Sequence, residues 1–324
     1  MWPELPHDLL CSIVDRMDQN KDWKSMGLVC SHWDKAVSLA THSVAVDHQR
    51  LHAIEWDRYP CLLDLHVELA WVDGLTFRSL RHAKSLKRLH LDSCHLGSFH
   101  LPHITNLANI SEVCLSGCSG INNALRCFRA LKGLKKLVIR YSDLMDSDMK
   151  WIKLLSGLEH LDLTGSRGLT DRALKTIGNM TQLNTLNLAE CSGVSDNGIR
   201  WLHSMTCMTH LDVSNCWEVT DAGFATIGQI KTLRSFRAMD LQAVSDEGIR
   251  ELEGLVNLTE LDIQSSFSLG LGDSACESLA KLKALVFLNL GTFADNDFTV
   301  EGLKLLEFIP YFSPCAENAA VDDN

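Results

Sequence analysis

A short apolar motif recurs along most of this chain and constrains its fold more than any other feature. The pattern is L-x-x-L-x-L, in which other apolar residues can replace leucine, and successive copies are 24 to 27 residues apart. Such regular spacing predicts an array of units that each pack only on their neighbours. The copies begin at Leu62, Leu86, Ile110, Leu134, Leu158, Leu183, Met208, Leu233, Leu258 and Leu285.

Each copy predicts a strand followed by a helix. In LEHLDLTGS and MTHLDVSNC the apolar residues alternate with polar ones, which is typical of a short strand with one buried face. The following segments, such as VSDNGIRWLHSM, space their apolar residues three and four apart and therefore predict helices.

An acidic residue marks the expected start of four of these helices, at Asp171, Asp196, Asp221 and Asp246. A row of acids could suggest metal ligands. Because they recur once per helix, after a Thr or Ser, we expect their carboxylates to cap the N–H groups of the first turn instead.

Four cysteines occupy equivalent places, eight residues into their repeats: Cys94, Cys118, Cys191 and Cys216. With the motif and its spacing, they make residues 60 to 310 resemble the cysteine-containing class of leucine-rich repeats, which is common in F-box proteins. The resemblance implies an α/β solenoid with parallel strands on its concave face and helices on its convex face. None of these cysteines has C-x-x-C spacing, so we expect no metal and no other cofactor.

The first forty residues do not fit the repeat. Apolar residues at helical spacing follow Pro6, and a second such series includes Trp33. So short a segment cannot bury all of these side chains, and we expect part of it to meet a partner. The segment resembles an F-box, whose L-P, apolar helix and closing V-C-x-x-W are matched by Leu5, Pro6, Leu9, Leu10, Ile13, Val14, Met17, Val29, Cys30 and Trp33.

This second resemblance implies a function. In the family these positions contact a Skp-type adaptor, which attaches the F-box protein to a cullin. The chain is then expected to be the substrate-recognition subunit of an SCF (Skp–cullin–F-box) ubiquitin ligase, directing a protein substrate to ubiquitination and proteasomal degradation. Alternatively, the same apolar residues cap the amino-terminal end of the repeats. The expected adaptor-binding residues are Leu5, Pro6, Leu9, Leu10, Ile13, Val14, Val29, Cys30 and Trp33.

Five segments are therefore expected. A repeat array needs a cap at each open end, and a short acidic tail with few large apolar residues is typical of disorder. The segments are an F-box-like helical module (1–40), a linker with a first strand or cap (41–61), a solenoid of about ten repeats (62–297), a C-terminal cap with a final helix (298–313) and a disordered acidic tail (314–324).

Composition narrows the possible partners. The net charge of −11 opposes binding to nucleic acid and to anionic membranes, which both require a surplus of Lys and Arg. No apolar run is long enough to span a bilayer, and the start lacks a signal-peptide pattern. The twelve cysteines are scattered, so reduced thiols and residence in the cytoplasm are expected, with the nucleus left open.

A substrate is expected on the strand face. If the leucines point inward, the residues between them line the concave side. An acidic row at Asp162, Asp212 and Asp262 would favour basic side chains, although a merely solvated face would look similar. The neighbourhood of Lys132, Lys135, Lys136 and Arg140 is basic instead. The expected contact residues are His160, Asp162, Asn187, His210, Asp212, Arg237, Glu260 and Asp262.

No catalytic motif is recognisable, whether nucleophile elbow, P-loop, dinucleotide fingerprint or H-E-x-x-H. We therefore expect a non-catalytic receptor. An interaction scaffold without a ligase role remains possible, as does an enzyme or enzyme-activating repeat protein with catalytic residues on its loops. Trp151 and Trp201 fall in predicted helices, where packing is the more common role of an aromatic residue.

Overall fold

The computed structural model describes residues 43–47, 59–68, 80–96, 101–121, 125–264, 270–291 and 297–312. These residues belong to two compact units, Met1–Leu134 and Lys135–Asn324, and each is considered by itself. Both units repeat one coil, in which a short strand is followed by a turn and a returning helical segment. The predicted α/β solenoid of parallel strands is thereby confirmed. The F-box-like module predicted for residues 1–40 lies outside the described residues.

The first unit returns through tight turns. Its coils close with 3₁₀ segments at Leu80–His82, Leu101–Asn106 and Leu125–Ala130. The helix-start pattern of Ser or Thr followed by Asp is missing from these segments, and Pro102 has no N–H to donate. Its strands, each parallel to the next, are β1 (Ser43–Asp47), β2 (Asp64–Glu68), β3 (Arg88–Asp92) and β4 (Glu112–Cys114).

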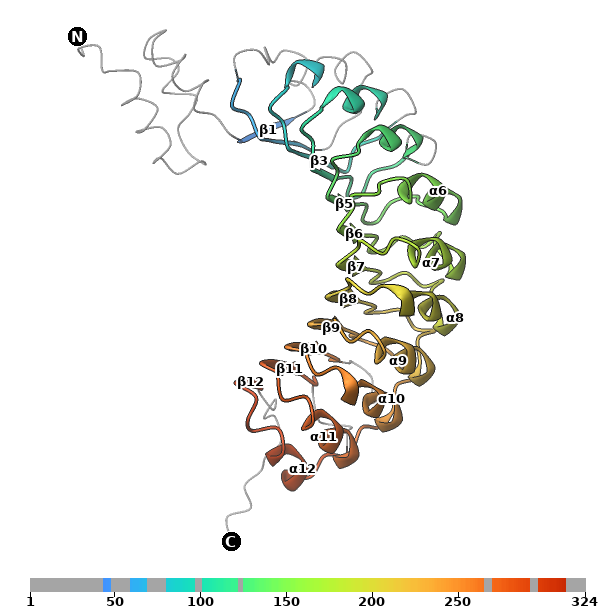
Figure 1. Ribbon diagram of the computed structural model, residues 1–324, viewed down its shortest axis with the longest axis vertical. Coiled ribbons are helices and arrows are strands. Elements are labelled where there is room, and N and C mark those ends of the chain that lie inside the picture. The colour runs from blue at the N-terminus through green and yellow to red at the C-terminus, as the bar shows by residue number, and fades with distance from the viewer. Residues whose placement is uncertain are drawn as a thin grey trace, which may run out of the picture. The chain divides into compact units, whose positions relative to one another are not determined.

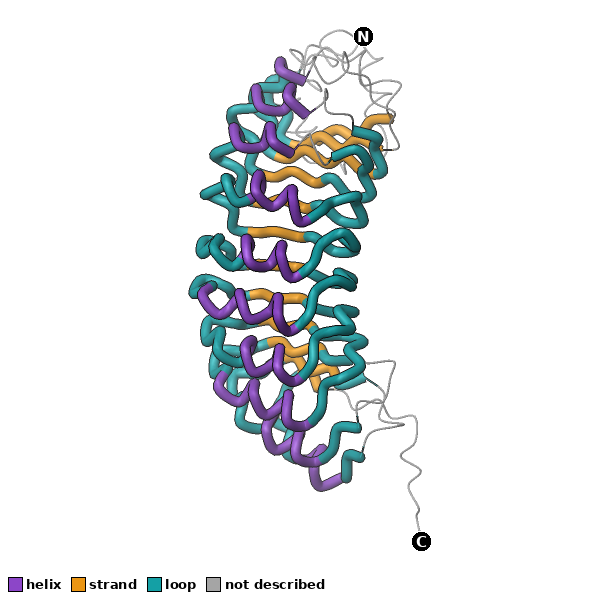
Figure 2. The backbone as a smooth tube through the Cα atoms, turned by 90° about the vertical axis from the view of Figure 1, so that its right-hand side faces the viewer, coloured by secondary structure: helices purple, strands orange, loops and turns teal. Residues whose placement is uncertain are grey.

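The second unit forms a regular stack, with strands along its inner side and helices along its outer side (Figure 1). Seen from the helix side, the helices form one column in front of the strands (Figure 2). Each strand pairs in parallel with its neighbour in sequence. The strands are β5 (Lys136–Val138), β6 (His160–Asp162), β7 (Thr185–Asn187), β8 (His210–Asp212), β9 (Ser235–Arg237), β10 (Glu260–Asp262), β11 (Phe287–Asn289) and β12 (Tyr311–Phe312).

Short helices cover the outer side of this unit. Two of those described continue into a 3₁₀ turn, α8 at Arg200–Ser204 and α10 at Leu252–Gly254. The helices are α6 (Met149–Ile152), α7 (Asp171–Ile177), α8 (Asp196–Ile199), α9 (Asp221–Ile227), α10 (Asp246–Glu251), α11 (Asp273–Leu279) and α12 (Val300–Lys304).

The core lies between strands and helices. The central residue of each three-residue strand points inward, and Leu161, Leu186 and Leu211 are almost wholly buried. Phe236 takes this place in β9 and packs edge-on against Phe224 of α9, with ring centroids 5.3 Å apart. Truncating one such leucine to alanine would cost about 2–5 kcal/mol, because the stack cannot close the cavity completely.

The acids at the helix starts do not cap their own helices, so that prediction was wrong. The cap is the preceding hydroxyl: Thr220 Oγ1 accepts a bond from Ala222 N at 3.3 Å. With the first turn already capped, the Asp196 carboxylate reaches the next repeat, where it accepts bonds from Thr220 N (2.9 Å) and Thr220 Oγ1 (2.7 Å). Asp171 and Asp196 therefore join consecutive repeats.

This arrangement recurs, and we call it the aspartate ladder. One step lacks the hydroxyl, because Gly272 offers Asp246 only its N–H, at 3.0 Å. Small residues make room for the carboxylates: a Cβ built on Gly248 would lie 2.2 Å from Asp221 Oδ1. The steps with both bonds are Asp146 to Thr170, Asp171 to Ser195, Asp196 to Thr220, Asp221 to Ser245 and Asp273 to Thr299.

The repeat cysteines serve the turn after the strand. The thiol of Cys191 donates to the Leu163 carbonyl at 3.3 Å, and that of Cys216 donates to the Leu188 carbonyl at 3.1 Å. Ser166 fills the same place one repeat earlier and donates to the Ile139 carbonyl. Burial raises the pKa of the Cys191 thiol to about 12, so it stays protonated and acts as a donor.

The carboxyl end differs from the prediction. A final helix was expected within residues 298–313, but α12 covers only Val300–Lys304. Ile309 is buried like the first leucine of a repeat, and two residues later Tyr311 begins β12. One further strand is thus added after the ten predicted repeats, since Phe287 and Leu288 of β11 pair with Tyr311 and Phe312.

Candidate functional site

The strand face of the second unit presents two rows of side chains. The strand register aligns the first residues of successive strands, and it aligns the third residues in the same way. From β6 to β11 the first row is His160, Thr185, His210, Ser235, Glu260 and Phe287, and the second row is Asp162, Asn187, Asp212, Arg237, Asp262 and Asn289.

All eight expected contact residues therefore lie on one face. Their exposure differs, however: His210, Arg237 and Glu260 are exposed, whereas Asp162 is only 1% exposed. The remaining members, His160, Asn187, Asp212 and Asp262, are half-buried. Binding at these positions stays a prediction.

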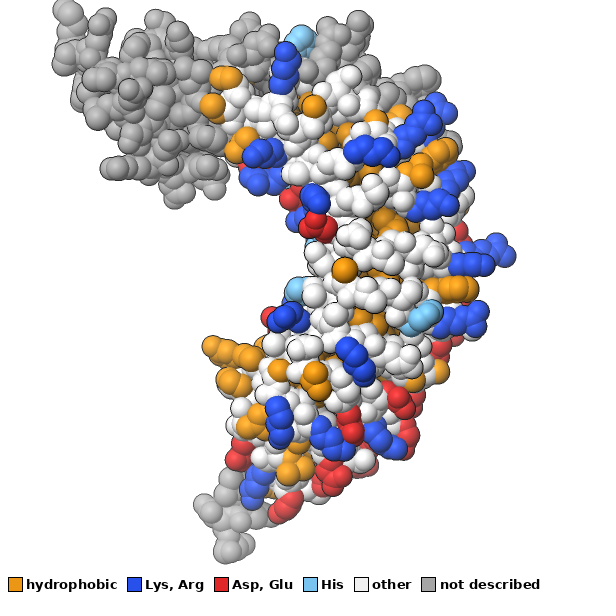
Figure 3. Space-filling model, in the orientation of Figure 1, with side chains coloured by type: hydrophobic (Ala, Val, Ile, Leu, Met, Phe, Trp, Pro, Cys, Tyr) orange, Lys and Arg blue, Asp and Glu red, His pale blue; other side chains and the backbone are white. Residues whose placement is uncertain are grey.

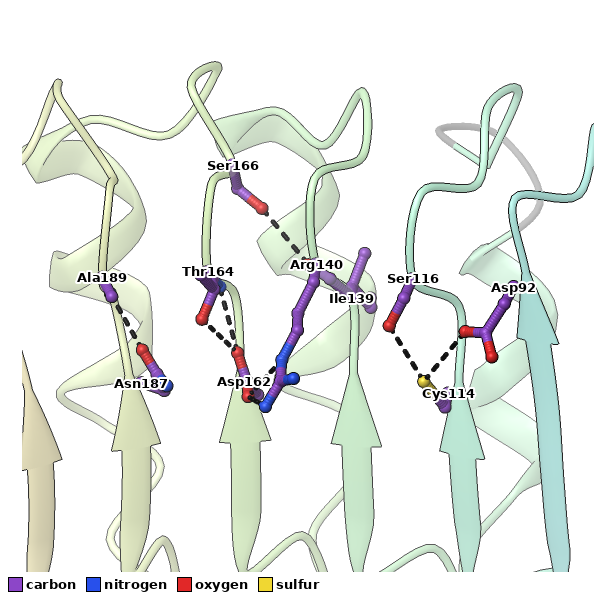
Figure 4. A network of polar contacts seen from close by, with 10 residues as sticks. All are labelled: Asp92, Cys114, Ser116, Ile139, Arg140, Asp162, Thr164, Ser166, Asn187 and Ala189. Carbon is purple, nitrogen blue, oxygen red and sulfur yellow. Dashed lines mark hydrogen bonds and ion pairs between the residues drawn. The ribbon is translucent and has the colours of Figure 1, made fainter.

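Asp162 is committed to internal bonds (Figure 4). Its Oδ1 accepts from Thr164 N at 3.1 Å and Thr164 Oγ1 at 2.7 Å. Its Oδ2 accepts from Arg140 Nε at 2.8 Å and Nη2 at 2.6 Å. A carboxylate with both oxygens satisfied and its charge matched by Arg140 has little left to offer a partner.

Other second-row oxygens share one structural task. Asn187 Oδ1 accepts from Ala189 N at 2.9 Å, as Figure 4 also shows, and Asp212 Oδ1 accepts from Ser214 N at 2.9 Å. An Asp or Asn that bonds the backbone two residues on forms an Asx turn, and here it fixes the end of the strand. The recurrence of Asp or Asn at this place in the sequence was the available signal for that task.

Arg237 interrupts the row. It stands between Asp212 and Asp262 in the register, is exposed, and makes no hydrogen bond or ion pair to any described residue. Burial raises the pKa of Asp262; the backbone N–H of Gln264 and the charge of Arg237 oppose that rise, while Asp212 adds to it. Asp212, Arg237 and Asp262 are thus a group of charges with capacity for outside partners.

The basic residues expected beside this row are largely engaged. Lys135 forms an ion pair with Glu159 at 2.5 Å, and Arg140 is bound to Asp162. The strand face of the first unit is internally paired as well, since Arg88 bridges to Asp64 and His66 lies 2.5 Å from Asp92.

Two aromatic side chains extend the first row beyond the expected residues. Phe287 is 38% exposed and pairs in register with Tyr311, which is 69% exposed. Hydrophobic side chains gather at this inner edge of the second unit in Figure 3. Tyr311 was missed because its coil keeps only the first two apolar positions of the motif, Ile309 and Phe312, and has Pro314 at the third.

The expected adaptor-binding residues, from Leu5 to Trp33, lie outside the described residues. In the part that is described, no group of three or more His, Cys, Asp or Glu side chains is arranged to hold a metal ion. None of the helices described is both long enough and apolar enough to cross a membrane.

Comparison with known proteins supports the repeat assignment. A family model described as "Leucine Rich repeat" matches residues 204–228. This segment begins at the end of the 3₁₀ turn that follows α8 and includes β8 and α9. No curated protein shows significant sequence similarity to the chain. An internalin (InlF) from Listeria monocytogenes is similar in structure, with 16% identity, 91% of this chain and 94% of that chain covered, and a TM-score of 0.54. The fold is a leucine-rich-repeat solenoid.

Further solved structures share this leucine-rich-repeat fold. A chain from the yeast Rad7–Elc1 complex has 19% identity, with 83% of this chain and 74% of that chain covered, at a TM-score of 0.58. A chain from a TLR13–ssRNA13 complex has 18% identity, with 84% of this chain and 38% of that chain covered, at a TM-score of 0.54. At such identities the likeness concerns the fold alone.

Proposed function

We propose that this leucine-rich-repeat protein is the substrate-recognition subunit of an SCF-type ubiquitin ligase. Its F-box-like segment would bind a Skp-type adaptor and, through it, a cullin, while the strand face of the second unit would hold a protein substrate. Its own role is non-catalytic, because other subunits carry out the transfer and the receptor contributes proximity and orientation.

The observation that carries the adaptor half is the sequence match from Leu5 to Trp33. The pattern combines an L-P pair, an apolar helix face and V-C-x-x-W in the order typical of F-boxes. The Rad7–Elc1 structure adds modest support, since a chain with this fold occurs there together with a second protein.

The substrate half depends on the strand face. A polar, partly unsatisfied surface on a rigid sheet suits protein recognition, because its groups are held in place before binding. Because Asp162 is already bonded to Arg140 and Thr164, the later repeats would recognise the substrate. There Asp212, Glu260 and Asp262 would attract basic side chains. Phe287 and Tyr311 add apolar area at the end of the same face.

A pull-down with a purified Skp-type adaptor tests the proposal. The intact chain is compared with a variant carrying Leu9→Ala, Ile13→Ala and Trp33→Ala. A matched control carries Leu305→Ala, Val256→Ala and Trp217→Ala, which remove similar side chains that are exposed in the second unit. Folding of each variant is checked by circular dichroism.

We expect the intact chain and the control to bind the adaptor and the first variant to lose binding. Absence of binding by the intact chain would reject the ligase role. The second candidate, a scaffold without a ligase, would then be favoured, since the leucine-rich repeats account for protein binding without any adaptor.

A further inference from the structure

The helix side of the second unit carries a column of cations. Lys150, Lys175 and Arg200 each follow an acid of the aspartate ladder by four residues, so they occupy equivalent places on α6, α7 and the end of α8. We call these three residues the cation column. Successive helices here are in contact, and Figure 3 shows Lys and Arg side chains gathered on this side of the repeats.

Among the described residues, no carboxylate forms an ion pair with these cations. None of the three makes an ion pair or a side-chain hydrogen bond to a described residue, and the same is true of Lys153 and Arg172 beside them. The reason lies in the ladder: the acids at the helix starts already accept an N–H and a hydroxyl from the next repeat.

Cations farther along the same side are different. Arg250 on α10 pairs with Glu247 at 3.1 Å, and Lys281 after α11 pairs with Glu253 at 2.7 Å. Exposure alone therefore does not explain the unpaired column, since paired and unpaired cations occur in the same fold and on the same side.

Two tryptophans hold the column in place. The Lys150 ammonium lies 5.1 Å from the centre of the Trp151 ring. Trp201 is approached by Lys175 at 5.2 Å and by Arg200 at 5.4 Å. Such contacts orient flexible side chains, so less freedom is lost when an anion binds them. Both rings are half-buried, so packing is only part of their role.

The limits of the column define the partner. It ends at α9, where Ala225 takes the equivalent place. On α10 that place is held by Arg250, which is paired with Glu247, and α10 and α11 also present Glu251 and Glu277. A long polyanion or a broad anionic surface would meet these acids, whereas a short acidic segment would not. Packed helices lie about 8–10 Å apart and an extended chain advances about 3.3 Å per residue, so an acid at every third residue matches the column.

We propose that the cation column binds a short acidic peptide segment of a partner protein. This surface is on the side opposite the strand face, so the inference is independent of the ligase proposal. Adaptor binding can fail without affecting it, and the reverse also holds.

The test uses a fluorescein-labelled peptide of about twelve residues with Glu at every third position, and the same peptide with Gln as its control. Anisotropy is measured on the full chain at ionic strengths of about 0.05 and 0.3 M, because screening weakens exposed charge pairs. One variant carries Lys150→Gln and Lys175→Gln; a matched variant with the same net charge carries Arg250→Gln and Lys281→Gln.

We expect the Glu peptide to bind more tightly than the Gln peptide, with affinity falling at high salt. Loss of two column charges should weaken binding about 5- to 30-fold, while the matched variant changes it less than about 2-fold. Equal weakening in both variants, or no preference for the Glu peptide, would overturn the proposal. Equal or tighter binding of single-stranded DNA or of phosphatidylserine vesicles would overturn the choice of an acidic peptide as the partner.

Discussion

The aspartate ladder predicts that a single carboxylate near the surface contributes measurably to the stability of the repeat stack. The most informative change is Asp196→Ala. Asp196 accepts bonds from the amide and the hydroxyl of Thr220, the residue that caps α9. Without the carboxylate, the Thr220 amide and hydroxyl can bond only to water, and these two hydrogen bonds between the coils of α8 and α9 are lost.

The magnitude follows from the two bonds. A hydrogen bond to a charged group contributes about 1.5–3 kcal/mol, and partial exposure places these bonds at the low end. We therefore expect Asp196→Ala to lower the free energy of unfolding by about 2–4 kcal/mol. Asp246→Ala is the matched control, because Gly272 supplies an amide but no hydroxyl, and it should cost about half as much.

Urea unfolding followed by circular dichroism gives these free energies, and hydrogen exchange of the Thr220 amide gives a local measure of the same link. A double-mutant cycle of Asp196→Ala with Thr220→Ala isolates the hydroxyl bond. We expect a coupling of about 1–2 kcal/mol. A coupling near zero, or an Asp246→Ala variant at least as unstable as Asp196→Ala, would refute this reasoning.

Three further predictions concern titrating groups. Burial raises the pKa of Cys276 to about 12 and also raises that of Cys216, so at pH 8 iodoacetamide should modify exposed Cys207 well before either; equal rates in peptide mapping of the folded protein would contradict this. For Asp262, Arg237→Gln should raise the carboxyl pKa and Asp212→Asn should lower it, as measured by carboxyl NMR titration, and a shift of opposite sign in either variant would show that these charges do not act on Asp262. For Asp273, bonds from the Thr299 hydroxyl and amide lower the pKa, so the link from α11 to α12 is fully present above the unfolded value near 4 and is lost as pH falls through the lower folded value. Hydrogen exchange of the Thr299 amide should show this acid-dependent loss, and an Asp273→Asn variant with the same pH dependence would exclude the carboxylate as its cause.

The repeat motif located the strands well because the apolar residues that define it are the ones the core buries. Each strand of the ten predicted repeats begins two residues after the first apolar residue of its copy, as His160 follows Leu158 and Phe287 follows Leu285. The spacing of the motif therefore gave the start of each of these strands. The coil after the tenth repeat escaped detection because Ile309 and Phe312 keep the first two apolar positions of the motif, while Pro314 replaces the third.

The tasks of the polar side chains were harder to predict. Asp162, Asp212 and Asp262 look equivalent in the sequence, yet only Asp162 is closed off, by Arg140 from the preceding repeat. The sequence located the ladder acids correctly at the helix starts, but their carboxylates accept bonds from the next repeat and not from their own helix. The same residue types serve both kinds of bond, so the sequence alone does not distinguish them. Only the spatial stacking of repeats distinguishes them.

The strand face of the second unit is the proposed substrate-binding surface, and a pair of charge-matched variants tests that role. One variant carries Asp212→Asn, Arg237→Gln and Asp262→Asn on the strand face. The other carries Glu247→Gln, Arg250→Gln and Glu277→Gln on the helix side, so both lose two acids and one cation.

Proteins that co-purify with the wild-type chain are quantified by mass spectrometry for both variants, after equal folding is shown by circular dichroism. We expect the strand-face variant to lose partners that the helix-side variant retains. Retention of every partner by the strand-face variant, or equal losses from both variants, would contradict it.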